Sequence, residues 1–166
     1  MGEKVAYYAD FVLFPLAVAI AVFIDRKAMG LQWISIAVLG WLTFTYAEYW
    51  VHRVVLHRYL WHGKHERHHR HPQEYVVFPI WTLPTGFFGL YAISTWLTGS
   101  AAFFSGVALG YVWFICWHHV LHHLDLTRWP RPVRSYAAWH DKHHDGLACN
   151  YGITVPWWDR LHGTSR

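Results

Sequence analysis

Histidine makes up 15 of the 166 residues, and its uneven distribution is the feature of this sequence with the clearest chemical meaning. None precedes His52, and none lies between His71 and His118. Neutral imidazole binds zinc, copper, iron and nickel. Ten of the histidines recur at spacings that can group their rings: His52, His57, His65, His68, His69, His118, His122, His140, His143 and His144.

Two segments share the pattern H-x2-H-H, HERHH at residues 65–69 and HDKHH at residues 140–144. Residues three and four positions apart lie on one face of a helix, so each segment can direct three imidazoles toward one region. His118 and His122, in HHVLHH, form a further pair four residues apart. We therefore expect three helical segments that each present a histidine face.

His52 and His57 in HRVVLH are five residues apart, which corresponds to about 140° around an α-helix. They should therefore serve different metals, unless one of them lies on a distorted turn. With this pair the clusters offer ten ligands, whereas one ion takes about four to six. Ten imidazoles fit two ions with open positions better than a single closed site.

No cluster of cysteines or carboxylates accompanies these histidines, so the ligand type alone leaves the metal undecided. A reaction with O2 favours two iron ions, because iron changes its oxidation state and zinc does not. An isolated sample could still carry zinc. A purely structural zinc site and a non-metal role for the histidines are the alternatives.

Side chains that contact the ligands should also be identifiable, because ligating histidines usually donate their second ring N–H to a carboxylate or a carbonyl. The candidates are Glu48, His123, Asp125, Asp141, Asp145 and Asp159. For Glu48, a place among the lipid headgroups is an equal alternative. Histidines outside the spacing pattern are expected beside the ligands or on the surface: His62, His71, His119, His123 and His162.

The composition indicates that a membrane positions these histidines. Charged residues make up only 14% of the chain, against about 25% in soluble proteins, and the 12 tryptophans suit a membrane interface. Four apolar stretches approach the length of about 20 residues that a spanning helix needs, and we read the first as a retained helix, not a cleavable signal. They lie at about residues 5–24, 31–50, 78–97 and 101–117.

Positive charges fall on one side of this four-pass arrangement. Five lie in residues 51–74, six in residues 118–166, and Lys4 is the twelfth, whereas the other side has only Arg26 and Lys27. The positive-inside rule then places both termini and both histidine segments in the cytoplasm. We predict one all-α domain over residues 1–166, an integral membrane four-helix bundle with a cytosolic, histidine-rich helical cap over residues 51–77 and 118–166 that holds a di-metal site.

Five segments resemble the fatty acid hydroxylase and sterol desaturase superfamily, and they fall within residues 46–164: YAEYWVHRVVLH, HGKHERHHRHPQEYVVFP, HHVLHH, WHDKHH and NYGITVPWWDRLHGT. The similarity is greatest to the fatty acid 2-hydroxylase branch. It implies metal ligands at the ten histidines named above and an O2-dependent hydroxylation of an unactivated C–H bond in a lipid, with a fatty acyl chain as the first choice. No fused cytochrome b5 domain accompanies these motifs, so a separate reductase, ferredoxin or cytochrome b5-like protein would supply electrons.

The lipid substrate is less constrained, because the chain is also close in length to the carotenoid ring hydroxylases. Hydroxylation of a carotenoid or sterol, or desaturation, therefore stays open. The acyl chain could contact aromatic side chains, although ordinary lipid-facing positions explain them equally well: Trp81, Phe87, Phe88, Trp113 and Phe114.

A different class of function, a non-catalytic membrane metal-binding or transport protein, is disfavoured because transporters place polar ligands at mid-membrane depth. The histidines here lie at the edges of the apolar runs or outside them. Nucleic-acid binding does not fit a four-pass protein, and the sequence does not indicate the oligomeric state.

Overall fold

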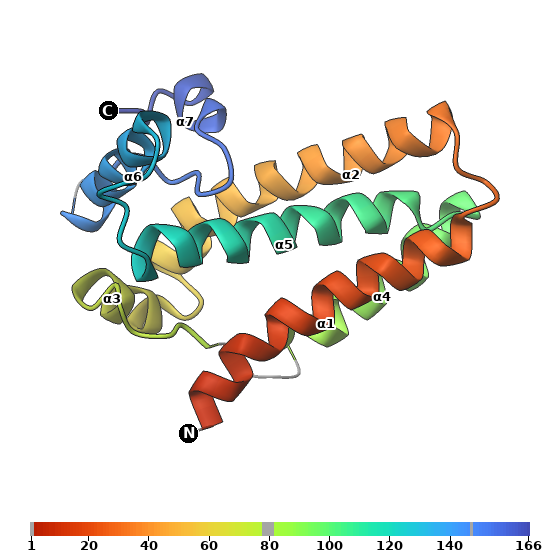
Figure 1. The fold of residues 1–166 in the computed structure, drawn as a ribbon, viewed down its shortest axis with the longest axis horizontal. Coiled ribbons are helices and arrows are strands. Elements are labelled where there is room, and N and C mark those ends of the chain that lie inside the picture. The colour runs from red at the N-terminus through yellow and green to blue at the C-terminus, as the bar shows by residue number, and fades with distance from the viewer. Residues whose placement is uncertain (1, 78–81, 147) are drawn as a thin grey trace. The chain divides into compact units, whose positions relative to one another are not determined.

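The computed structural model describes residues 2–77, 82–146 and 148–166, and these residues contain helices and no strand, which confirms the all-α class (Figure 1). The elements follow one another as α1 (Gly2–Asp25), α2 (Leu31–Trp50), the π-helix η1 (Val51–Leu56), α3 (His62–Arg70), α4 (Thr82–Thr98), α5 (Ala102–His123), α6 (Arg131–His144) and α7 (Trp157–Leu161).

The chain forms two compact units. Unit 1 consists of Met1–Phe44 and Val77–Ile115, and unit 2 consists of Thr45–Val76 and Cys116–Arg166. All ten candidate ligands belong to unit 2. The single domain over residues 1–166 stays a prediction.

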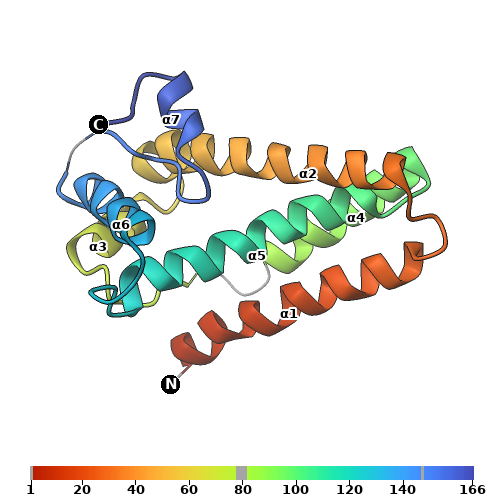
Figure 2. The same cartoon turned by 45° about the horizontal axis from the view of Figure 1, so that its top comes forward.

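Unit 1 is built from α1, α4 and the greater parts of α2 and α5, which Figures 1 and 2 show as the long helices of the molecule. Among the described residues, two helices are long and apolar enough to cross a membrane, Glu3–Asp25 and Ala102–His123. Many large apolar side chains of α1 are exposed, for example Val12 (65%) and Phe23 (62%). A surface of this kind suits contact with lipid better than contact with water.

The four-pass bundle and its cytoplasmic orientation remain predictions. The expected third pass over residues 78–97 begins outside the described residues, which resume with α4 at Thr82.

Glycines allow α2 and α5 to approach each other closely inside unit 1. A Cβ atom at Gly106 would collide with the carbonyl of Ala37, and one at Gly40 would collide with the carbonyl of Phe103. At Gly110 a Cβ would lie 2.7 Å from the Phe44 ring. Gly106 and Gly110 form a G-x3-G pair, a spacing that lets apolar helices pack backbone against backbone.

Gly106→Ala should therefore destabilise unit 1 by about 1–3 kcal/mol, because the added methyl group forces α2 and α5 apart. The measurement is thermal unfolding in detergent. Gly89→Ala in α4 is the matched control, because a Cβ at Gly89 meets no atom within 4 Å and alanine favours the helix. Equal unfolding midpoints for the two variants would contradict the close-packing argument.

Candidate metal centre

The structure brings nine of the ten predicted histidines into two groups of imidazoles within unit 2. The ring nitrogens of His52, His57, His65, His69 and His143 lie within 4.8 Å of one another and form the first group. Those of His68, His118, His122 and His144 form the second group. His140 adjoins the second group, with its Nε2 atom 3.1 Å from that of His122 and 3.2 Å from that of His144.

Each H-x2-H-H segment divides its histidines between the two groups. In α3, His65 and His69 enter the first group while His68 enters the second. In α6 the arrangement is reversed, because His143 enters the first group and His144 the second. In each helix the two histidines four residues apart share a face, and the third histidine points away from that face. One short helical segment therefore contributes to both groups.

The π-helix η1 decides between the two alternatives for His52 and His57. The wider π turn bonds residue i to residue i+5 and therefore stacks residues five apart on one face. The two rings lie 5.3 Å apart with an interplanar angle of 25°, and both belong to the first group. The structure thus has the distorted turn, and it places both rings in one group of imidazoles instead of two.

The Nε2 atoms of His52 and His143, in the first group, face each other, and neither of them carries a proton. The Nδ1 atoms of His52 and His143 donate to the backbone carbonyls of Tyr151 (2.5 Å) and Cys149 (2.8 Å). Burial lowers the pKa of His52 well below 6.5 and that of His143 to about 3, so each ring is neutral. Their Nε2 atoms therefore present bare lone pairs, only 3.0 Å apart.

A shared cation accounts for this geometry. The Nε2 atoms of His143, His52, His65 and His57 form a closed ring in which neighbours lie 3.0–3.2 Å apart. Two nitrogens that each lie about 2.0–2.1 Å from one ion are separated by about 2.9–3.4 Å at ordinary coordination angles. The residues therefore fit a metal ion, and the all-imidazole donor set suits iron, zinc, copper or nickel.

The two groups adjoin each other, since the rings of His69 and His144 stack with centroids 4.5 Å apart. They differ in how their imidazoles are held. The Nδ1 atoms of His68 and His140, at the second group, are buried without a hydrogen-bond partner among the described residues. Backbone carbonyls orient two imidazoles of the first group, His52 and His143.

With this geometry established, comparison with known proteins identifies the family. A family model described as fatty acid hydroxylase matches residues 37–164. The chain belongs to the fatty acid hydroxylase family. This confirms the resemblance found in the histidine motifs.

Two curated relatives of the chain are each longer than the part that it matches. A dihydroceramide fatty acyl 2-hydroxylase of Arabidopsis thaliana is 33% identical over 79% of this chain and 60% of its own. A ceramide very long chain fatty acid hydroxylase of Schizosaccharomyces pombe is 29% identical over 79% of this chain and 42% of its own. The chain thus spans about half of the length of these relatives.

One solved structure shares the fold of this chain. It is full-length scs7p, in which only the hydroxylase domain is visible. The TM-score is 0.78 at 23% identity, and the match covers 96% of this chain and 66% of that chain.

Glu48 and Asp159, two of the carboxylates predicted to contact the ligands, instead contact the backbone of a loop beside them. Glu48 accepts hydrogen bonds from the backbone N–H groups of Ile153 and Thr154, and the buried Asp159 accepts those of Tyr151 and Gly152. Neither carboxylate forms a hydrogen bond with an imidazole among the described residues. They hold the loop whose Tyr151 carbonyl orients His52, so backbone carbonyls take the role predicted for carboxylates.

The other predicted neighbours of the ligands lie outside the two groups. Asp125 is exposed and accepts the Thr127 backbone N–H, and Asp141 and Asp145 are exposed on and beside α6. His123 stacks on Tyr75 at 5.2 Å. The remaining histidines, His62, His71, His119 and His162, also lie outside the two groups.

The aromatic residues predicted to contact substrate lie in unit 1. Phe87 packs on Phe14 and Tyr111, and Phe114 packs on Tyr111. Phe88 and Trp113 are exposed, at 72% and 49%. Trp81 lies outside the described residues. Contact between these residues and a substrate remains a prediction.

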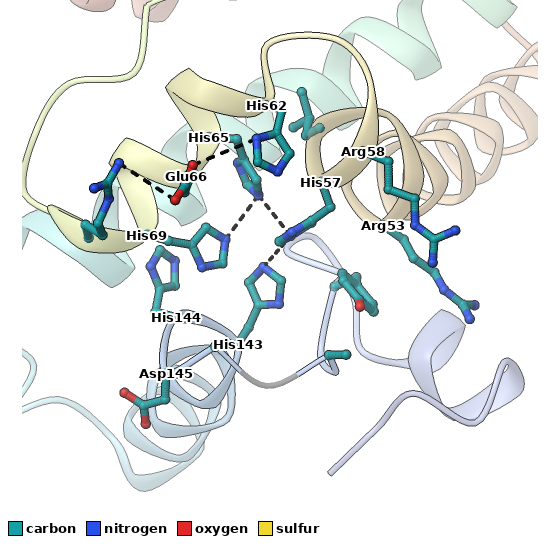
Figure 3. A pocket seen from close by; sticks show the side chains of 15 residues that line it. Arg53, His57, Arg58, His62, His65, Glu66, His69, His143, His144 and Asp145 are labelled. Atoms are coloured by element: carbon teal, nitrogen blue, oxygen red, sulfur yellow. Dashed lines mark hydrogen bonds and ion pairs between the residues drawn. The ribbon is translucent and has the colours of Figure 1, made fainter.

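An open cleft of about 660 Å³ borders the first group, as Figure 3 shows. Its wall includes the first-group residues His57, His65, His69 and His143. The rest of the lining is largely charged or polar, and the only second-group member in the wall is His144. The first group is therefore the one that an incoming molecule reaches through this cleft.

Unit 2 of the metal-free protein should lose stability as the pH falls from about 6.5 to about 4. Burial lowers the pKa of His69 and His144 to about 4 and that of His143 to about 3. In this window the unfolded chain binds protons that the folded chain excludes, so acid favours unfolding. Thermal unfolding of chelator-treated protein should show a lower midpoint at about pH 5 than at about pH 7.5. A midpoint that is unchanged or higher in acid would contradict the neutral state of these rings.

Proposed function

We propose that this chain is an O2-dependent, di-iron membrane oxygenase that hydroxylates an unactivated C–H bond of a lipid, with a fatty acyl chain as the substrate. The observation that carries the proposal is the pair of adjoining imidazole groups in a chain of the fatty acid hydroxylase family. Because the chain spans only part of its relatives, their named activities support the proposal without establishing it.

The proposed ligands are the first-group histidines for one ion and the second-group histidines, together with His140, for the other. Iron ions held there would supply the oxidising power for C–H hydroxylation by activating O2. Zinc would fit the same nitrogens, but it does not change oxidation state. Iron is therefore the functional metal of the proposal.

The protein's own contribution is orientation of the ligands and exclusion of water. The Tyr151 and Cys149 carbonyls fix the tautomers of His52 and His143, which leaves both Nε2 lone pairs directed at the same point. The buried carboxylates of Glu48 and Asp159 immobilise the loop that carries one of these carbonyls. Such supporting contacts tune both metal affinity and reactivity.

The proposal includes a lipid substrate, an electron-transfer partner and a location in the membrane. The substrate is a membrane lipid, and a separate electron-transfer protein, such as a ferredoxin, a reductase or a cytochrome b5-like protein, supplies electrons. The protein crosses the membrane several times, with unit 2 and both termini in the cytoplasm. The excess of Lys and Arg in residues 51–74 and 118–166 supports this orientation.

Lipid mass spectrometry of cells with and without the protein tests the function. Expression should produce lipids heavier by one oxygen atom, and fragmentation should locate that oxygen in the acyl chain. Product on a sterol or carotenoid would support the alternative substrates. If no lipid gained oxygen and no lipid-dependent O2 consumption occurred with the iron-loaded protein and a ferredoxin donor, the chain would be a non-catalytic metal-binding protein.

A further inference from the structure

The charges along the cleft at the first metal group are distributed unevenly. On one side the Glu66 carboxylate lies 3.8 Å from the Arg70 guanidinium and 3.9 Å from the His62 ring. Figure 3 shows Glu66 and Asp145 on the opposite side of the histidines from Arg53 and Arg58. Two guanidinium groups therefore occupy a part of the cleft wall that lacks an acidic residue.

Arg53 lies in the π-helix η1, and Arg58 follows its end, directly after His57. They are also five residues apart, and Figure 3 shows both side chains extending to the same side of the cleft. Neither forms an ion pair with a carboxylate among the described residues. Neighbouring like charges repel each other, so this arrangement is unfavourable until an anion binds.

Arg53 is held in place by groups that leave its charge uncompensated. Its Nη1 atom donates to the Tyr49 hydroxyl at 2.7 Å. Its guanidinium carbon lies 5.4 Å from the Trp50 ring centroid and 5.9 Å from that of Tyr151. Arginine stacked on aromatic rings keeps its other N–H groups available for a planar anion such as a carboxylate or a phosphate.

The Tyr151 hydroxyl adds a third donor at this point. The hydroxyl makes no hydrogen bond to a described residue, and Tyr151 lines the cleft. The Arg53 guanidinium lies beside the Tyr151 ring, and Arg58 lines the same cleft. The Tyr151 ring also contacts two first-group ligands, with centroids 5.5 Å from His57 and 5.1 Å from His143.

We propose that Arg53, Arg58 and the Tyr151 hydroxyl form a binding site for the anionic head of the lipid substrate, a carboxylate or a phosphate. This inference rests on the proposed lipid oxygenase function. A guanidinium group binds a carboxylate or a phosphate through two parallel, charge-assisted hydrogen bonds. The substrate then carries a net negative charge, which ceramide-type lipids lack.

Binding of defined lipids to zinc-loaded protein in neutral nanodiscs tests the site without any turnover. The probes are palmitate and phosphatidate, with palmitamide as the uncharged analogue and inorganic phosphate as the headless anion. Arg58→Gln and Tyr151→Phe should weaken binding of palmitate, phosphatidate or both by about tenfold or more. Both should leave palmitamide binding unchanged. Arg58 is exposed and the Phe variant keeps the ring, so both variants should fold.

Arg70→Gln is the matched control, because it removes an equal charge from the same cleft at a position where Glu66 already compensates it. It should alter anion affinity by less than about twofold. Equal losses in Arg70→Gln and Arg58→Gln would overturn the site in favour of general electrostatic attraction. Equal losses of affinity for palmitate and palmitamide would also overturn the proposed site. Displacement of the bound lipid by inorganic phosphate at a similar concentration would overturn the assignment to a lipid head.

The binding assay separates this site from the proposed function. If expression yields no hydroxylated lipid but anion binding still depends on Arg58, the function fails and the anion site stands. If hydroxylated lipid forms while anion affinity is the same in Arg58→Gln and the unaltered protein, the function stands and the anion site fails.

Discussion

Replacement of His143 by Ala should remove the metal ion of the first group and reduce lipid hydroxylation by at least about a hundredfold. His143 faces His52 at 3.0 Å and His57 at 3.2 Å through its Nε2 atom, so it belongs to the closed ring of four nitrogens. Its side chain is almost fully buried, at 1% exposure, and a water molecule in its place would not be oriented by the Cys149 carbonyl in the same way. Metal content per chain, measured by elemental analysis, should fall by about one ion.

His71→Ala is the control for this variant, because His71 is exposed and lies in neither group. It should retain both ions and full hydroxylation. Circular dichroism of the His143→Ala protein should show helices intact, which separates the loss of a ligand from unfolding. A His143→Ala protein with unchanged metal content and turnover would contradict the assignment of the first group as a metal site.

Histidine spacing predicted much of the centre because it depends on local helix geometry. The pairs four residues apart in α3, α5 and α6 share a face wherever a helix forms, so His65 and His69 could be grouped before any tertiary structure was known. For His52 and His57 the spacing left two alternatives open, and the helix that holds His52 is of the π type. The residue types give no sign of this π-helix, because Val51–Leu56 contains neither proline nor glycine.

The supporting contacts could not be predicted from residue types. The carbonyls of Cys149 and Tyr151 orient ligands through the backbone, and every residue has such a carbonyl. Which carbonyl reaches a ring depends on the path of the loop before α7, a long-range property of the fold. Glu48 and Asp159, predicted to accept ring N–H groups, instead accept hydrogen bonds from the backbone of this loop.

Asp159→Ala should destabilise unit 2 by about 2–5 kcal/mol, because it leaves two buried N–H groups without acceptors. The carboxylate is fully buried and accepts hydrogen bonds from Tyr151 N (2.8 Å), Gly152 N (2.7 Å) and the Thr164 hydroxyl (2.7 Å). Released from this anchor, the Tyr151 carbonyl would no longer fix the His52 tautomer. Metal affinity of the first group should then fall by about tenfold to a hundredfold. Thermal unfolding and metal titration measure the two effects separately.

Asp125→Ala provides the matched control, because Asp125 is exposed and its hydrogen bonds with Thr127 are local. Its stability should change by no more than about 0.5–1 kcal/mol, with metal affinity unaltered. Hydrogen exchange at residues 149–155 should be faster in Asp159→Ala and unchanged in Asp125→Ala. If Asp159→Ala accelerated exchange in this loop but bound metal as tightly as the unaltered protein, the loop would be a structural element only. Orientation of His52 by the Tyr151 carbonyl would then have no influence on the metal.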